Sequence, residues 1–297
     1  MTTSGTFYQY SPNHNLFAFE FGTLHSKKVL IFVGGLGDGF LTVPYLSLLA
    51  QRLAQIGWSL IQIQTTSSYI GWGTGSLWRD SSEIAELATY LKSKDTDGGA
   101  REVVGIMGHS TGCQNTIHYF TRQSRDSDYC ELDFGIIQAP VSDRYAAKIF
   151  IPEYLREESI ELAKKLIDEG NELQLMPYKY TQHFFGAPIN AYRWYSLMSI
   201  RGDDDFFSPD LTADDLATTF GKFDKPLLVL YSGDDEFVPE DVDKEEVMRR
   251  FSAAAKNSWS EYSKIVKGGS HNLKDEEPAA DAVDVVVKFL GQIAKGA

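Results

Sequence analysis

The sequence predicts an α/β fold, in which a mostly parallel sheet is flanked by helices and one helical cap is inserted. Two observations support this. Short apolar and β-branched runs alternate with stretches of helical periodicity along most of the chain. The alternation is interrupted once, between residues 141 and 221, where no strand-like run of the same quality occurs.

Six apolar runs are the expected strands of the sheet. Their residues do not alternate between apolar and polar, which is typical of strands buried on both faces. Residues 7–21, which precede them, alternate enough to supply one or two antiparallel edge strands. The six runs are residues 28–33, 59–64, 102–107, 133–138, 226–231 and 262–266.

Three apolar stripes with helical spacing lie between or after these strands. For the first helix, Thr42 is the expected N-cap, with Pro44 in the first turn and Gly57 just beyond the end. The last stripe predicts that the chain ends on a helix docked against the sheet. The stripes are Leu46, Leu49, Leu53 and Ile56, then Leu77, Ile84, Leu87 and Leu91, then Val283, Val286, Val287, Leu290 and Ile293.

The segment that lacks strands is interpreted as a helical cap. It contains a charged amphipathic stretch at residues 156–169, followed by aromatic-rich loops. The expected organisation is a core made of residues 1–140 and 222–297, with the cap at residues 141–221.

Charge and composition exclude several classes of partner. With 28 basic and 41 acidic residues among 297, the formal charge is −13, and this field repels nucleic acid and anionic membrane surfaces. The first ten residues do not resemble a signal peptide, and no apolar run approaches the ~20 residues of a membrane span. Two cysteines are too few for a disulfide framework. We therefore expect a soluble cytoplasmic protein, of undetermined oligomeric state.

The sharpest local signal is the pentapeptide at residues 108–112, Gly-His-Ser-Thr-Gly. It follows a predicted strand and precedes a helical stretch, which is the context of the nucleophile elbow in serine hydrolases. The tight turn requires the flanking glycines and lifts Ser110 clear of the sheet edge. The alternative is a chance pentapeptide in a buried turn.

A serine nucleophile requires a base and an acid, which this fold supplies in the order Ser, Asp, His. His271 lies in a glycine-containing loop directly after the last predicted strand. In hydrolases whose acid loop ends in Asp-x-x-Val-Pro, the acid lies four residues before the proline, which favours Asp235. Asp234 remains the alternative acid.

Two backbone N–H groups are the expected oxyanion hole. One belongs to Thr111, the residue after the nucleophile, and the other to Leu36 in the glycine-rich loop at residues 34–39. A phosphate-binding loop is the competing interpretation, but neither Gly-x-x-x-x-Gly-Lys-[Ser/Thr] nor Gly-x-Gly-x-x-Gly occurs there.

On these residues the chain resembles the fungal siderophore-esterase-like branch of the α/β hydrolases. The resemblance implies the α/β-hydrolase fold and the hydrolysis of ester bonds, such as those joining the hydroxamate units of a fusarinine-type siderophore. Iron would then arrive within the substrate. The matching stretches are residues 32–39, 67–74, 108–114, 138–144 and 202–208.

The candidate substrate-binding residues are Gly35, Trp72, His109 and Trp194. Trp72 lies in a glycine-rich loop near the expected mouth of the site, and Trp194 is one of several cap aromatics that either form a pocket or only pack the cap. The run at residues 203–205, three aspartates, is either a cation site or a helix-capping or hinge element. We favour the second interpretation and expect no metal site.

The predicted function is a carboxylic-ester hydrolase that uses Ser110, Asp235 and His271 and requires no cofactor. The substrate partner is a small-molecule ester, an iron siderophore among the candidates. Two alternatives remain open: a non-catalytic ligand-binding protein on the same scaffold, and an acyltransferase or thioesterase that uses the same acyl-enzyme.

Overall fold

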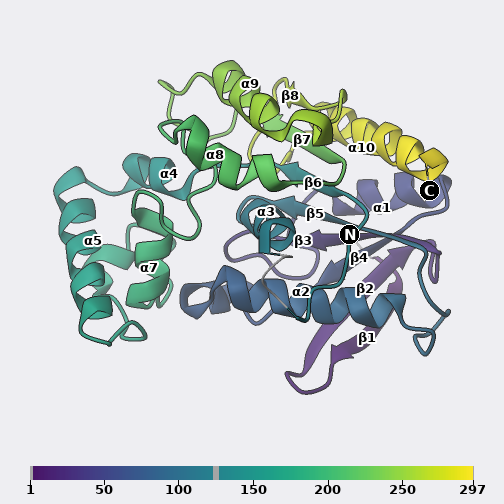
Figure 1. Ribbon diagram of the computed structural model, residues 1–297, viewed down its shortest axis with the longest axis horizontal. Coiled ribbons are helices and arrows are strands. Elements are labelled where there is room, and N and C mark those ends of the chain that lie inside the picture. The colour runs from purple at the N-terminus through teal and green to yellow at the C-terminus, as the bar shows by residue number, and fades with distance from the viewer. Residues whose placement is uncertain (1–2, 123–126, 297) are drawn as a thin grey trace.

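The computed structural model describes residues 3–122 and 127–296. Its strands form one eight-stranded sheet (Figure 1). The strand order is β1-β2-β4-β3-β5-β6-β7-β8. Neighbours pair in parallel from β4 to β8, whereas β2 pairs antiparallel with both β1 and β4. The strands are β1 (Gly5–Ser11), β2 (Leu16–Gly22), β3 (Lys28–Val33), β4 (Ser59–Ile63), β5 (Val103–His109), β6 (Gly135–Gln138), β7 (Leu227–Ser232) and β8 (Lys264–Val266).

Helices cover both faces of the sheet. Those of the core are α1 (Leu46–Gln55), α2 (Leu77–Lys92), α3 (Gly112–Arg122), α9 (Lys244–Ala255) and α10 (Glu276–Gly296), with short helical turns η1 (Tyr69–Thr74), η2 (Phe220–Lys222) and η3 (Lys256–Ser258). One apolar cluster joins α1 and α10 to the sheet, and another joins α2, α3 and α9 to its opposite face. None of the helices among the described residues is long and apolar enough to span a bilayer.

Strand β3 shows how side-chain alternation divides the core between these two clusters. Val29 and Ile31 point to the cluster of α2, α3 and α9, while Leu30 and Phe32 point to the cluster of α1 and α10. All four are fully buried. Burying such side chains contributes about 1.5–3 kcal/mol each, which explains why the four consecutive positions at residues 29–32 are all apolar.

The structure confirms the predicted strands to within about two residues, and the segment predicted to give one or two antiparallel strands forms β1 at the sheet edge and β2 beside it. The predicted start of the first helix was wrong. Thr42 does not cap α1, which begins at Leu46 without a side-chain cap, and Pro44 lies before the helix. The reason is that the Thr42 hydroxyl donates to Asp38 Oδ1 at 2.8 Å in the preceding loop.

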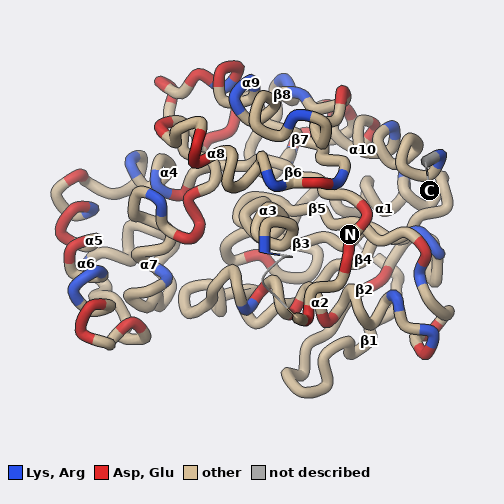
Figure 2. The backbone as a smooth tube through the Cα atoms, viewed as in Figure 1, with Lys and Arg blue, Asp and Glu red and all other residues tan. Residues whose placement is uncertain are grey.

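Helices α4 (Asp143–Phe150), α5 (Glu153–Asp168), α6 (Tyr178–Thr181), α7 (Ala191–Met198) and α8 (Ala213–Thr218) lie between β6 and β7. A third apolar cluster, made of residues between 147 and 198 together with Trp72 of η1, packs α4, α5, α6 and α7 against one another. In Figure 1, α4, α5 and α7 lie to one side of the sheet. Figure 2 shows acidic and basic residues interspersed along α5. By contrast, α8 packs against α9, and its Leu216 belongs to the core. The boundary of the cap at residue 221 stays a prediction.

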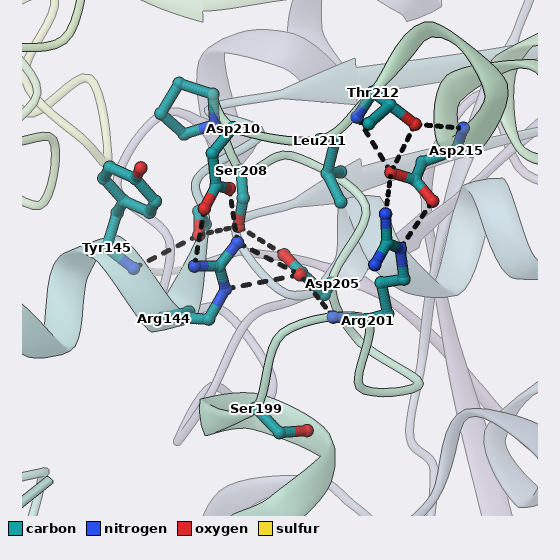
Figure 3. Close-up of polar contacts among 12 residues, drawn as sticks. Arg144, Tyr145, Ser199, Arg201, Asp205, Ser208, Asp210, Leu211, Thr212 and Asp215 are labelled. Atoms are coloured by element: carbon teal, nitrogen blue, oxygen red, sulfur yellow. Dashed lines mark hydrogen bonds and ion pairs between the residues drawn. The ribbon is translucent and has the colours of Figure 1, made fainter. Parts of the chain in front are cut away.

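An ion-pair network fixes the start of this inserted segment to its end (Figure 3). Arg144, the second residue of α4, donates to Asp210 Oδ2 at 3.1 Å and to Asp205 Oδ2 at 3.3 Å. Asp205 also accepts from the backbone N–H of Arg201 and from the Ser208 hydroxyl. Because one guanidinium serves two carboxylates from the returning chain, the two connections to the core are held together.

We expect Arg144→Ala to destabilise the protein more than Arg201→Ala does. The Arg144 side chain is 9% exposed, and its removal leaves the buried Asp205 without its cation, which we expect to cost about 2–4 kcal/mol. The Arg201 side chain is 62% exposed, so its pair with Asp215 contributes less than about 1 kcal/mol. Thermal unfolding of both variants measures the difference. Equal midpoints would contradict this role of Arg144.

Candidate active site

Ser110 occupies the turn between β5 and α3 in a left-handed backbone conformation, with φ of 54°. The glycines on either side allow the turn to close. A Cβ at Gly108 would lie 2.0 Å from the carbonyl oxygen of Gly112, and a Cβ at Gly112 would lie 2.2 Å from that of Val33. No other residue fits these two positions without displacing the backbone, so the elbow geometry is set by the sequence.

A continuous line of polar contacts runs from Ser110 to a buried carboxylate. The Ser110 hydroxyl oxygen lies 2.8 Å from His271 Nε2. On the other side of the ring, Nδ1 lies 2.8 Å from Asp235 Oδ2 and 3.0 Å from Oδ1. The backbone N–H of His271 donates to Glu236 Oε2 at 2.9 Å, which fixes the loop that carries the ring.

The two candidate acids differ in position. Asp235 is 4% exposed and faces His271, and its Oδ1 also accepts the backbone N–H of Phe237 at 3.0 Å. Asp234 is exposed at the surface. The aromatic ring of Phe237 packs edge-on against the imidazole, with centroids 4.6 Å apart. The imidazole is therefore held by a carboxylate on one nitrogen and by an aromatic ring on its face.

The glycine-rich loop comes against Ser110 from the other side. An added Cβ at Gly35 would lie 2.5 Å from the Ser110 Cβ. Asp38 closes this loop, since its Oδ2 accepts the Gly35 N–H at 2.8 Å. Within residues 3–122 and 127–296, no acceptor is found for the backbone N–H of Leu36 or of Thr111. These are the two groups that the sequence predicted as oxyanion donors.

His109 is held by the side chain of Gln138 at the end of β6. His109 Nδ1 lies 2.6 Å from Gln138 Oε1, which also accepts the Tyr45 hydroxyl at 3.0 Å. Burial and the neighbouring His271 lower the pKa of His109 to about 4. The ring is therefore neutral at neutral pH. Gln138 Nε2 donates to the His271 carbonyl at 3.1 Å, so one buried amide links the elbow to the histidine loop.

A cavity of about 150 Å³ opens beside Ser110 and His271. Gly35, Leu36 and His109, three of the predicted site residues, are among the residues that line it. Phe184 and Phe185 from the inserted segment and Phe237 from the acid loop supply aromatic walls. Phe185 stays 58% exposed, which places it at the rim.

Asp143 also lines this cavity, and sequence reasoning did not single it out as a site residue. It is the first residue of α4 and accepts from Gln114 Nε2 at 2.6 Å. Burial, reinforced by Asp204, raises the pKa of its carboxyl to about 8. One sequence feature could have identified Asp143 as a site residue. It lies within the matching stretch at residues 138–144, directly after the predicted strand that follows the elbow.

The two predicted tryptophans lie elsewhere. Trp72 lines a separate cavity of about 30 Å³ with Leu36 and Thr111, and its ring lies edge-on against Phe184 and Phe185. Trp194 is fully buried within the third apolar cluster, where its Nε1 donates to Ser159 at 3.0 Å. Neither lines the cavity beside Ser110, because both rings are used to pack the inserted segment.

The three consecutive aspartates each meet a different partner. Asp203 accepts the Tyr192 hydroxyl at 2.6 Å, Asp204 pairs with Arg193 at 2.5 Å, and Asp205 belongs to the network in Figure 3. Among the described residues, no group of three or more potential ligands could hold a metal ion. The three side chains therefore hold parts of the inserted segment to one another.

Comparisons with known proteins identify the family of this chain. The family model "Protein of unknown function (DUF1749)" matches residues 1–294. A UPF0613 protein of Schizosaccharomyces pombe is 43% identical over 84% of this chain and 81% of its own. Fusarinine C esterase sidJ of Aspergillus fumigatus is 35% identical over 94% of this chain and 93% of its own. The solved structure of siderophore hydrolase EstB from the same fungus has a TM-score of 0.84 and 32% identity, covering 99% of this chain and 98% of its own.

The expected resemblance and the α/β-hydrolase fold are confirmed by these matches. A further α/β-hydrolase-fold structure, 17% identical with a TM-score of 0.72, supports the fold alone.

We expect Gly35→Ala to slow the reaction of Ser110 with a fluorophosphonate probe by at least about tenfold, because an error of about 1 Å in position costs up to about 100-fold. The new methyl group would lie 2.5 Å from the Ser110 Cβ and must displace it or the loop. Gly291→Ala in α10, where an added Cβ meets nothing within 4 Å, is the control. An unchanged labelling rate in folded Gly35→Ala would disprove the close approach.

Proposed function

Since this chain belongs to the DUF1749 family and is an ester hydrolase of the α/β-hydrolase fold, we propose that it cleaves carboxylic esters through an acyl-enzyme on Ser110. The observation that carries the proposal is the line of contacts from Asp235 through His271 to Ser110, which ends at an open cavity. A serine hydroxyl becomes a good nucleophile when a base takes its proton as it attacks.

In the first half of the reaction, His271 Nε2 accepts the Ser110 proton while the serine oxygen adds to the ester carbonyl. Asp235 keeps the proton of His271 on Nδ1 and stabilises the imidazolium that forms. The imidazolium then gives its proton to the leaving alcohol. His109 does not compete as the base, because its Nδ1 is engaged by Gln138 and its low pKa makes it a poor proton acceptor at neutral pH.

Charge develops on the carbonyl oxygen as the tetrahedral intermediate forms. We assign its stabilisation to the backbone N–H groups of Leu36 and Thr111, which have no other acceptor among the described residues. The tie between Asp38 and Gly35 fixes the first of these donors in advance. In the second half, water replaces the alcohol, and His271 deprotonates it for attack on the acyl-enzyme.

The proposed substrate is a siderophore-type ester, as the names of the relatives indicate for those proteins. The cavity beside Ser110 holds one arm of such a molecule between the aromatic side chains of Phe184, Phe185 and Phe237. Its open rim leaves the rest of a bulky ester outside. Any iron enters with the substrate.

The test compares four variants by fluorophosphonate labelling and by turnover of 4-nitrophenyl acetate and fusarinine C. Ser110→Ala is expected to lose labelling, and Ser110→Ala or His271→Ala to lower kcat by up to about 10⁶-fold. Asp235→Asn is expected to lower kcat by about 10⁴-fold, since the wrong tautomer is then favoured. Asp234→Asn is the matched control, because its carboxylate is exposed and a change below about twofold is expected.

Two outcomes would reject the proposal. Labelling or turnover that persists in folded Ser110→Ala would place the nucleophile elsewhere. An equal loss of activity in Asp234→Asn and Asp235→Asn would remove the assigned acid. Turnover of 4-nitrophenyl acetate without turnover of fusarinine C would keep the mechanism and reject the substrate.

A further inference from the structure

Asp143 is the feature of the cavity that the proposed mechanism does not use. Its side chain lines the same cavity as Ser110 and His271. The residue is partly exposed, so a molecule in the cavity can reach it. It is the first residue of α4, so the inserted segment brings it to the reacting groups.

The two carboxylate oxygens of Asp143 differ in their contacts. Oδ2 accepts from Gln114 Nε2 at 2.6 Å, and Gln114 is itself 1% exposed, so this oxygen is firmly held. Among the described residues, none donates a hydrogen bond to Oδ1. In the other aspartate of the lining, Asp38, both oxygens have partners: Oδ2 accepts the Gly35 N–H and Oδ1 accepts the Thr42 hydroxyl. Asp143 therefore presents the open carboxylate oxygen of this cavity.

The nearby arginines are paired with other carboxylates, although the charge of Arg193 opposes part of the rise in the pKa of Asp143. Arg193 is committed to Asp204 at 2.5 Å and to the Trp72 carbonyl at 3.2 Å. Arg144 is committed to Asp205 and Asp210 (Figure 3). Within the described part of the chain, the cavity lining contains no lysine or arginine. Among the described residues, no cation pairs with Asp143, so once this carboxyl ionises, a ligand that pairs with it must bring hydrogen-bond donors or positive charge.

From this arrangement we infer that Asp143 is a specificity residue, which selects esters carrying an alkylammonium group within reach of the scissile bond. The inference rests on the proposed function and names the substrate class for the same site. The ammonium donates to Oδ1 and forms a charge-assisted hydrogen bond. An uncharged ester of the same shape leaves that oxygen unpaired.

A purely structural role accounts poorly for this carboxyl. A carboxylate in the first turn does stabilise a helix, but the α4 N-terminus already has Ser142, whose side chain accepts the Tyr145 N–H. The pKa of about 8 shows that the empty site disfavours the charged form, with Asp204 and Asp205 adding repulsion. A cationic ligand reverses that balance, because it stabilises the ionised carboxylate.

The test uses two matched pairs of esters, because the ammonium can lie on either side of the scissile bond. In the acyl pair, 4-nitrophenyl 6-aminohexanoate is compared with 4-nitrophenyl heptanoate. In the alcohol pair, S-(2-dimethylaminoethyl) thioacetate, whose protonated amine carries one N–H, is compared with the uncharged S-(3-methylbutyl) thioacetate. The readout is the ratio of kcat/KM for the charged ester to that for the neutral one, together with the separate kcat and KM values.

In at least one pair, the wild-type ratio is expected to fall by about 10-fold or more in Asp143→Asn, through KM more than kcat. Asn keeps the size of the side chain and its acceptor for Gln114. Asp214→Asn is the matched control, an exposed carboxylate in the first turn of α8, and should change the ratio by less than about twofold. A loss of the same size in both variants would show a general charge effect and overturn the assignment.

A measurement on the wild type does not depend on the folding of any variant. Hexylammonium should inhibit hydrolysis of the neutral esters competitively and more strongly than 1-hexanol, and equal inhibition overturns the inference. If the charged and the neutral ester of each pair are hydrolysed with equal kcat/KM, the inference is overturned and the proposed function stands. No hydrolysis of any ester by folded wild type would instead reject the proposed function, and this inference with it.

Discussion

The close approach of two backbone segments at the Ser110 turn is the constraint on which the site depends. Gly108 and Gly112 leave no room for a Cβ, and Gly35 brings a second loop to within contact of the serine. The sheet supports this arrangement, because β5 pairs with β3 on one side and with β6 on the other. Strain at the serine, whose φ is 54°, is tolerated because buried strands and α3 fix both of its ends.

Polar links then tie separate elements to this turn. Gln138 connects the elbow histidine to the histidine loop, and Asp38 closes the glycine-rich loop. The inserted segment is anchored by Arg144. It supplies Asp143 and two of the aromatic side chains in the cavity wall, Phe184 and Phe185. The core thus provides the groups proposed for the reaction, while the inserted segment supplies part of the cavity wall. The specificity proposed for Asp143 therefore rests on the part of the chain whose secondary structure the sequence predicts least clearly.

Sequence reasoning recovered what local patterns encode. Strands buried on both faces have continuous apolar runs, and the elbow requires glycines at fixed positions, so both could be predicted. The order Ser, Asp, His along the chain pointed to Ser110, Asp235 and His271 as candidates. The contact between Asp235 and His271 favours Asp235 over Asp234 as the acid. Contacts that depend on the tertiary structure could not be predicted from local sequence patterns. Thr42 bonds Asp38 instead of capping a helix, Trp194 packs within the inserted segment, and the position of Asp143 depends on how α4 docks.

We propose that Ser110 takes part covalently in the reaction. Detection of the acyl-enzyme is the most direct test of this role. Wild-type protein is mixed with excess 4-nitrophenyl acetate, quenched in acid during the first turnovers and digested, and the acylated peptide is located by mass spectrometry. The account predicts a burst of about one equivalent of nitrophenol and an acetyl group on the hydroxyl of Ser110. An acetyl group that accumulates on another side chain with the kinetics of the burst, while Ser110 stays unmodified, would contradict it.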